Sequence, residues 1–522
     1  MSERAAFRSA LAAFSTQRAP IFRTGPGAER EHSAPAEMPV RDAVLHGLCW
    51  QAMALALLGT HVLLVREAGT AFFLVAIVFI VLLYVRLPLA GFALGLNVLL
   101  YQNWVLALFS ETMELSAFQV LQGTAFVVTA ALATIAAVRL IRSGPRGGQA
   151  LRVAWTVCVV VAVMVAYTVL GAVQSGPTSA IISFRNAASG LLALLVGLDV
   201  GRRWGYRTIG TGFLVAAALG VLLSMYEQLD PIAYYEATGA STFLRLKEQV
   251  VEADVALRSA ADIVLYRTSV FFNITGGDVD ALSFRFGGPN MHNVSYAYVL
   301  AAIGLVALTL RMYWYVAVVL PLLVLIGVKG ALILFLVSVA LHVNWVMLGQ
   351  ARLLIVLGLV LFIIYVAFGL TMGVARQDFH VLGFLGGVNG FLSNPVGHGI
   401  GVGGNLSTDA ATMGTVGLNE DRIRIWQKFQ NEGTTDIAVE SAVGVLLYQM
   451  GMGVVAVFWA LIAVLRSARS PRAPSTGPRP TDLLFIALSV VSVNGIFQEE
   501  AYYPLAMGLI LMFCGIVIAN GD

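Results

Sequence analysis

Four ionisable residues lie within or at the edge of apolar stretches of this sequence. Arg185 lies in ISFRNAAS, Lys329 is a lone base in LIGVKGALI, and Glu499 and Glu500 are adjacent in IFQEEAYYP. A charge at the centre of a membrane helix costs about 2.5–3.5 kcal/mol on insertion scales, so such residues usually mark a function or a buried ion pair. Bases can stabilise an anionic leaving group, and a carboxylate can accept a proton. For each residue taken singly, a snorkelling side chain or an internal salt bridge is an equally weighted alternative.

A polar stretch that ends in SFRFGGPNMHNVSYAYVL offers further candidates. Arg285 precedes a Gly-Gly-Pro-Asn turn, and this turn opens the next apolar run. His292 follows the turn, and His398 lies in a later glycine-rich segment. Either histidine could act as a general base, although a lone histidine beside glycine is more often structural.

The glycine-rich segment NPVGHGIGVGGN begins a second long polar stretch. Its glycines, among them Gly399 and Gly401, allow close backbone approach and suit an anionic or sugar ligand, but many glycine-rich loops have no such role. The stretch continues with LNEDRIRIWQKFQNEG, in which Arg422 and Arg424 form a basic cluster. Glu440 follows at the mouth of an apolar run, where a partly desolvated carboxylate is suited to general-base catalysis.

Motifs of soluble enzymes are missing from the sequence. It contains no P-loop, no HExxH and no GxSxG. We therefore expect no metal site and no cofactor. The formal net charge of +3 is small for 522 residues and gives no support to a nucleic-acid partner.

The elements that must position these residues are membrane helices. The chain is 58% hydrophobic and 12% charged, whereas soluble proteins are about 45–50% apolar and ~25% charged. Seven apolar runs of membrane-spanning length precede the first long polar stretch and seven follow it, which predicts an all-α polytopic fold of about fourteen transmembrane helices. The runs begin near Val44, Thr70, Pro88, Phe118, Val153, Thr178, Ile209, Val294, Tyr313, Ala331, Leu353, Ser441, Leu483 and Tyr503.

The orientation follows from the arginines. Cytoplasmic loops collect Lys and Arg, and alternate loops of this chain do so if both termini are cytoplasmic. These loops hold Arg86, Arg139, Arg142, Arg146, Arg152, Arg202, Arg203, Arg207, Arg311, Arg352, Arg466, Arg469, Arg472 and Arg479. The two long polar stretches then face the periplasm of a bacterial inner membrane, where we expect the chemistry.

This topology divides the chain into six segments. They are a mostly disordered cytoplasmic tail (1–43), an N-terminal bundle of about seven helices (44–226), a first large periplasmic loop (227–292), core helices (293–375), a second large periplasmic loop (376–440) and C-terminal helices (441–522). The first large loop should contain an amphipathic helix from a Ser241 N-cap to near Arg267, which either lies on the membrane surface, covers a cavity or simply packs on the bundle.

From about Arg285 to Gly453 the sequence resembles the superfamily of bacterial O-antigen ligases and Wzy-type O-antigen polymerases. Members carry an Arg before a Gly-Pro-Asn turn that enters a span, matched here by Arg285 and the turn at 288–290. Their Ser-Arg-Gly-Ala hairpin is matched by Val-Lys-Gly-Ala, so that Lys329 replaces Arg. Their Asn-Pro-x-Gly-x-Gly-x-Gly segment is matched from Asn394. Ligases have His-Asn where this chain has Glu440-Ser441, and this departure favours a polymerase.

The resemblance implies a GT-C-like membrane glycosyltransferase that acts at the periplasmic face without a metal ion. Donor and acceptor would be undecaprenyl-diphosphate-linked glycans, and a chain-length-regulating membrane protein would be a further partner beside the membrane lipids. Glu440 would be the general base, with Arg285 and Arg422 as further catalytic residues. The expected diphosphate- and substrate-binding residues are Arg185, Lys329, Arg424, His292, His398, Gly399, Gly401, Glu499 and Glu500.

Two other functions remain open at the level of sequence. A ligase would use the same donor but transfer the finished glycan to lipid A core or to protein. A lipid-linked oligosaccharide flippase or a secondary transporter is the alternative of a different class. Such carriers often have related halves and broken midplane helices, and the sequence shows no paired halves.

Overall fold

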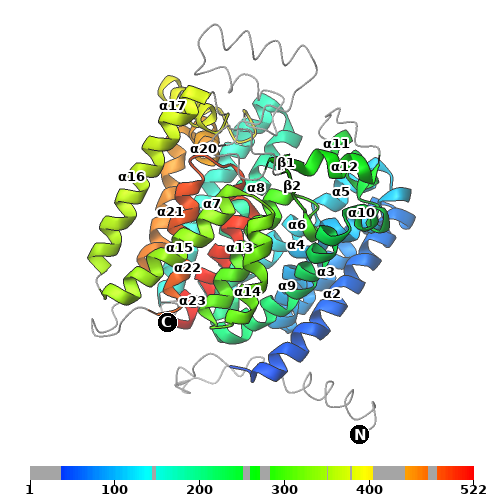
Figure 1. The fold of residues 1–522 in the computed structure, drawn as a ribbon. Coiled ribbons are helices and arrows are strands. Elements are labelled where there is room, and N and C mark those ends of the chain that lie inside the picture. Colours follow the sequence, from blue (N-terminus) through cyan, green and yellow to red (C-terminus); the bar gives the residue numbers. More distant parts are fainter. Residues whose placement is uncertain are drawn as a thin grey trace.

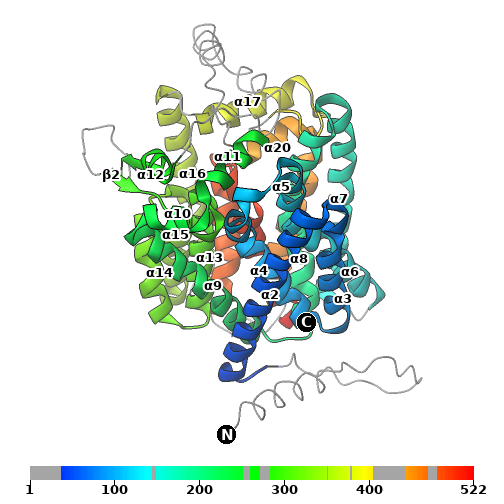
Figure 2. The ribbon, with the colours of Figure 1, turned by 90° about the vertical axis from the view of Figure 1, so that its right-hand side faces the viewer.

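The computed structural model describes residues 37–143, 148–250, 259–270, 282–349, 351–376, 379–403, 441–467 and 479–521. Within these ranges the chain is a nearly all-helical polytopic membrane protein, shown from two sides of the bundle in Figures 1 and 2. Among the described residues, ten helical segments are long and apolar enough to cross a membrane, and four shorter apolar helices accompany them.

The first half of the bundle consists of helices that follow one another through short connections. Pro88 and Pro177 each stand at the start of a helix, where a proline lacks only a donor that would be unpaired anyway. The helices are α2 (Val40–Ala68), α3 (Phe73–Arg86), α4 (Pro88–Leu108), α5 (Leu115–Gln122), α6 (Thr124–Arg142), α7 (Gly148–Ser175), α8 (Pro177–Gly201) and α9 (Tyr206–Leu229).

The second half continues the bundle on the far side of the first loop. Ser441 caps α20 by accepting a hydrogen bond from the Gly444 amide at 2.9 Å. The helices are α13 (Asn293–Thr309), α14 (Tyr313–Leu325), α15 (Lys329–Leu348), α16 (Ala351–Arg376), α17 (Phe379–Ser393), α20 (Ala442–Met450), α21 (Val454–Ser467), α22 (Asp482–Asn494) and α23 (Leu509–Gly521). Two short turns, η6 (Glu500–Tyr502) and η7 (Pro504–Gly508), lead into α23.

The first loop differs from the single amphipathic helix that we expected. It forms α10 (Pro231–Thr238), α11 (Ala240–Val250), α12 (Ala260–Arg267) and the turn η4 (Gly288–Asn290). It also contains a two-stranded antiparallel hairpin of β1 (Thr268–Val270) and β2 (Leu282–Phe284). Ser241 lies inside α11 and is not its cap, whereas Ser259 and Asp262 form a capping box that starts α12.

The second long polar stretch, in which short helices were expected, begins with a helix. Residues 379–393 form the apolar helix α17, which packs against α20. This segment contains glycines at 383, 386, 387 and 390. Two of them are packing positions, since a side chain at Gly387 would clash with the Gly444 backbone and one at Gly390 with the Tyr448 ring.

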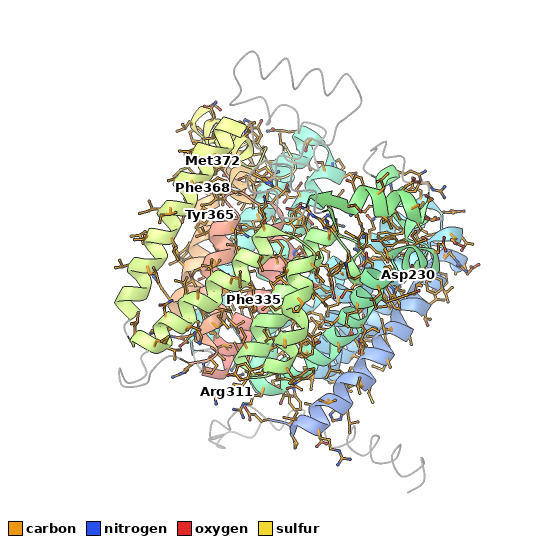
Figure 3. All side chains as sticks on the ribbon, in the orientation of Figure 1. Asp230, Arg311, Phe335, Tyr365, Phe368 and Met372 are labelled. Carbon is orange, nitrogen blue, oxygen red and sulfur yellow. The ribbon has the colours of Figure 1, made fainter. Side chains whose placement is uncertain are left out.

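Different elements of the chain lie at the two ends of the bundle. In both ribbon views α2 begins and α23 ends at one end, while α11, α17 and α20 lie toward the other. Figure 3 places Arg311 at the first of these ends and Met372 of α16 toward the second. Apolar side chains such as Phe368 face outward along α16, as expected of a helix that contacts lipid.

Candidate functional site

A cavity of about 390 Å³ lies between the first loop and the helices of the bundle. Three of the expected substrate-binding residues line it: Arg185 of α8, His292 before α13 and Glu500 of η6. Lys247 of α11 and Asn290 of η4 line the same cavity. The cavity therefore brings together two cations, one carboxyl side chain, an imidazole and an amide from five separate segments.

Close packing of α8 against α23 explains why Arg185 and Glu500 face one space. A side chain at Gly197 would clash with the Met512 carbonyl, and one at Gly201 would lie 2.7 Å from the Ile516 Cα atom. Small residues let membrane helices approach backbone to backbone in this way. Because α8 and the η6–η7–α23 segment run side by side, their residues line one wall of the cavity.

Helix α11 carries Lys247 into the cavity from the first loop. Phe243, one helical turn earlier, lines the same cavity, and its ring packs edge-on against Phe118 with centroids 5.5 Å apart. Arg245, on another side of the helix, is exposed. Burial and the nearby Arg267 and Arg185 guanidinium groups lower the pKa of the Lys247 amine to about 8.

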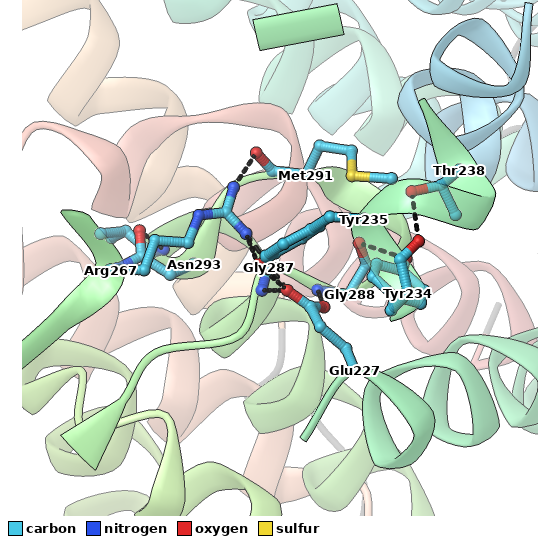
Figure 4. A network of polar contacts seen from close by, with 10 residues as sticks. Glu227, Tyr234, Tyr235, Thr238, Arg267, Gly287, Gly288, Met291 and Asn293 are labelled. Carbon is cyan, nitrogen blue, oxygen red and sulfur yellow. Dashed lines mark hydrogen bonds and ion pairs between the residues drawn. The ribbon is translucent and has the colours of Figure 1, made fainter. Parts of the chain in front are cut away.

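A buried ion pair supports the turn that carries Asn290 and His292 (Figure 4). Glu227 Oε1 lies 3.2 Å from Arg267 Nη1, and the Glu227 carboxylate also accepts the backbone N–H groups of Gly287 and Gly288 at 2.8 and 2.6 Å. Arg267 Nη2 donates to the Met291 carbonyl at 2.8 Å, and Tyr235 donates to Glu227. Both charges are thus paired by several hydrogen bonds, as a buried ion pair requires.

His292 has a structural role, which is the more common role of a lone histidine near glycines. It is the N-cap of α13, and its Nδ1 atom accepts the Ser295 N–H at 3.3 Å. Burial, with Lys247 and Arg267 nearby, lowers the pKa of His292 to about 3. The imidazole is therefore neutral at physiological pH and too weak a base to be a good general base. With Nδ1 as acceptor, Nε2 carries the proton.

The adjacent glutamates line two different hollows. Glu500 lines the large cavity, whereas Glu499 lines a smaller one of about 40 Å³ together with Gly403 and Ala442. Asn186 and Tyr503 line both, and the Tyr503 hydroxyl donates to Glu499 at 3.1 Å. The two carboxyl groups are thus separated by the side chains of α8 and of the turn before α23.

Arg285 and Lys329 are placed elsewhere, near one another. The Arg285 Nε atom lies 3.6 Å from where a side chain at Gly327 would begin, and Gly327 precedes α15, whose first residue is Lys329. Neither residue lines the large cavity. Their predicted roles in catalysis and in diphosphate binding remain predictions.

The glycine-rich segment is held among three helices. Side chains at Gly399 and Gly401 would clash with the backbones of Gly171 in α7 and Ala180 in α8, and both glycines have positive φ, of 96° and 102°. The His398 ring stacks on Tyr448 with centroids 4.1 Å apart. Packing thus accounts for these residues, and their predicted substrate contacts are untested.

Three predicted residues of the second loop, Arg422, Arg424 and Glu440, lie outside the residues that the structure describes. Lys247 and Asn290 are two of the cavity residues that sequence analysis missed. Lys247 could have been found as a charge one turn from Phe243, on a side of α11 that also carries apolar residues. Asn290 was noticed only as part of a turn, because nothing local shows that its amide is buried.

No protein-family model, no curated protein and no solved structure matches this chain. The resemblance to O-antigen ligases and polymerases therefore rests on the sequence motifs alone.

Proposed function

We propose that this protein is a glycosyltransferase that polymerises undecaprenyl-diphosphate-linked oligosaccharide repeat units into a surface polysaccharide. The observation that carries the proposal is the cavity in which Arg185 and Lys247 face the same space as Glu500. A diphosphate leaving group needs fixed cations, and a sugar acceptor needs a group that takes up its proton. A membrane-embedded cavity with both kinds of side chain suits a lipid-linked substrate.

The proposed reaction is one displacement at an anomeric carbon. An acceptor hydroxyl oxygen forms a bond to C1 of the donor sugar while the bond from C1 to the diphosphate oxygen breaks. Undecaprenyl diphosphate leaves with the electron pair, and the acceptor proton passes to a carboxylate. Arg185 and Lys247 stabilise the charge that develops on the diphosphate, so this scheme needs no metal ion.

Two carboxyl groups can serve as the base in this proposal. Glu440 was the choice from sequence, and Ser441 directly after it caps α20, next to the smaller cavity. Glu500 lines the large cavity with the cations. The Glu440→Gln and Glu500→Gln variants distinguish them, because the variant that lacks the base loses turnover while it still binds donor lipid.

The membrane arrangement is part of the proposal. Ten long and four shorter apolar helices would make the fourteen spans, with both termini in the cytoplasm of a bacterial cell. Arg139 and Arg142 end α6 and Arg466 lies in the last turn of α21, which agrees with a cytoplasmic side at these helix ends. The first loop, with Lys247, is then periplasmic.

Incubation of the purified protein in nanodiscs with a lipid-linked repeat unit tests the function. A polymerase yields a ladder of products, and Arg185→Gln lowers kcat/KM by about 100-fold. Arg142→Gln is the matched control, since Arg142 is exposed at the opposite end of α6. A single block on lipid A core or protein would indicate a ligase. Unchanged substrate that crosses the bilayer of a proteoliposome would indicate a carrier.

A further inference from the structure

Three of the side-chain amides that line the large cavity, those of Asn103 in α4, Gln122 at the end of α5 and Asn290 in η4, are here called the amide cluster. Asn103 Nδ2 donates to the Asn290 carbonyl at 2.9 Å. Gln102, beside Asn103, donates to the Gln122 carbonyl at 2.9 Å. Hydrogen bonds to the backbone thus fix the positions of Asn290 and Gln122 relative to α4.

Asn290 has an unused acceptor. The residue is only 3% exposed, and its Nδ2 atom donates to the Leu100 carbonyl at 3.3 Å. Its Oδ1 atom is buried and has no hydrogen-bond partner among the described residues. A buried unpaired oxygen is unfavourable, and native proteins rarely keep one without a role. A ligand that enters the cavity with a hydroxyl or N–H donor would satisfy it.

The amide cluster is distinct from the cations in the same cavity. Its residues come from α4, α5 and η4, whereas Arg185 belongs to α8 and Lys247 to α11. The rings of Phe126, which packs edge-on against Phe184 at 6.0 Å, and of Phe243 also line the cavity. Neutral amides beside apolar rings suit a ligand that has hydroxyl groups and C–H faces but no charge.

We infer that the amide cluster binds the hydroxyl groups of a hexose that is joined to the diphosphate held by the cations. This inference rests on the proposed function and adds that the cavity recognises the sugar as well as the phosphates of the substrate. Asn290 accepts a hydrogen bond from a sugar hydroxyl through Oδ1, and the Gln122 amide contacts a neighbouring hydroxyl. The cavity then has one end for the charged part of the lipid-linked substrate and one for the neutral part.

Binding measurements in nanodiscs test this division. The probes are undecaprenyl diphosphate itself and the same lipid carrying glucose, galactose or N-acetylglucosamine. We expect at least one sugar-bearing lipid to bind wild type about tenfold more tightly than the bare lipid. Asn290→Leu and Gln122→Leu remove this preference and leave the affinity for the bare lipid unchanged, whereas Arg185→Gln weakens binding of all four lipids.

Asn97→Leu is the matched control. Asn97 is a buried residue of the same helix α4, with an unpaired Oδ1 atom, but it lines a different, smaller hollow. Its substitution should leave the sugar preference intact. Equal binding of the bare and all sugar-bearing lipids by wild type would overturn the inference, as would an unchanged preference in both cluster variants. If none of the lipids binds, the proposed function itself fails.

Discussion

Glu227 and Arg267 form an ion pair that is almost completely buried, with 0% and 8% of the residues exposed and 3.2 Å between Oε1 and Nη1. Neither residue lines the large cavity. The pair connects the end of α9 and the end of α12 to the turn at 287–291, because both residues also bond that backbone. It therefore holds Asn290 and His292 in the cavity wall.

Removal of Arg267 alone should be strongly destabilising. Arg267→Leu leaves the Glu227 charge buried without its partner, which costs about 3–5 kcal/mol. We expect a lower thermal unfolding temperature in detergent, and Glu227→Gln in the same chain should recover part of the loss. Arg245→Leu, at an exposed position of α11, is the control. Equal unfolding temperatures for Arg267→Leu and the control would show that the pair contributes little.

Lys247 predicts a pH dependence of donor binding. With its pKa lowered to about 8, the amine is mostly charged at pH 7 and mostly neutral at pH 9. Affinity for undecaprenyl diphosphate should therefore fall by up to about tenfold over this range. Lys247→Arg keeps the charge at both pH values and should bind with little change. An equal decrease in Lys247→Arg would assign the titration to another group.

Sequence analysis located the spans and the main charged residues but not how the first loop folds. Hydropathy predicts the bundle because every span must be apolar, whereas the orientation inferred from the arginines remains a prediction. Arg185 and Glu500 were conspicuous as charges in apolar surroundings. Lys247 lies in an ordinary amphipathic segment, and only the packing of Phe243 against Phe118 shows that its side of α11 faces inward.

The β1–β2 hairpin and the Glu227–Arg267 pair were also not predictable. The paired strands are only three residues long, and the ion pair joins residues that are 40 positions apart in the sequence, so no local pattern indicates either contact. Residues 379–393 were assigned to the second loop, and they contain several glycines. Those that replace side chains at helix contacts, such as Gly387 against Gly444, stabilise α17 through packing that a single sequence does not reveal.

His292 predicts a specific sensitivity to acid. Its pKa is about 3 in the folded protein and ~6.5 in an unfolded chain, so between these values the unfolded state binds more protons. Stability is therefore lost as the pH falls from 7.5 to 5. His292→Asn keeps an N-cap without a titrating group, and we expect its unfolding temperature to fall by roughly 2 °C less than that of wild type. The same decrease in both proteins would contradict this assignment.

Gly197 tests whether the α8–α23 contact holds the cavity wall together. Gly197→Ala places a methyl group against the Met512 carbonyl, and because backbone cannot move aside cheaply, the two helices must separate. We expect a lower unfolding temperature and weaker binding of undecaprenyl diphosphate, since Arg185 and the turn with Glu500 move apart. Gly212→Ala in α9 is the matched control, because nothing lies within 4 Å of the added methyl group. Alanine favours a helix over glycine by about 1 kcal/mol, so the control should be neutral or stabilising, and like behaviour of the two variants would exclude close packing at Gly197.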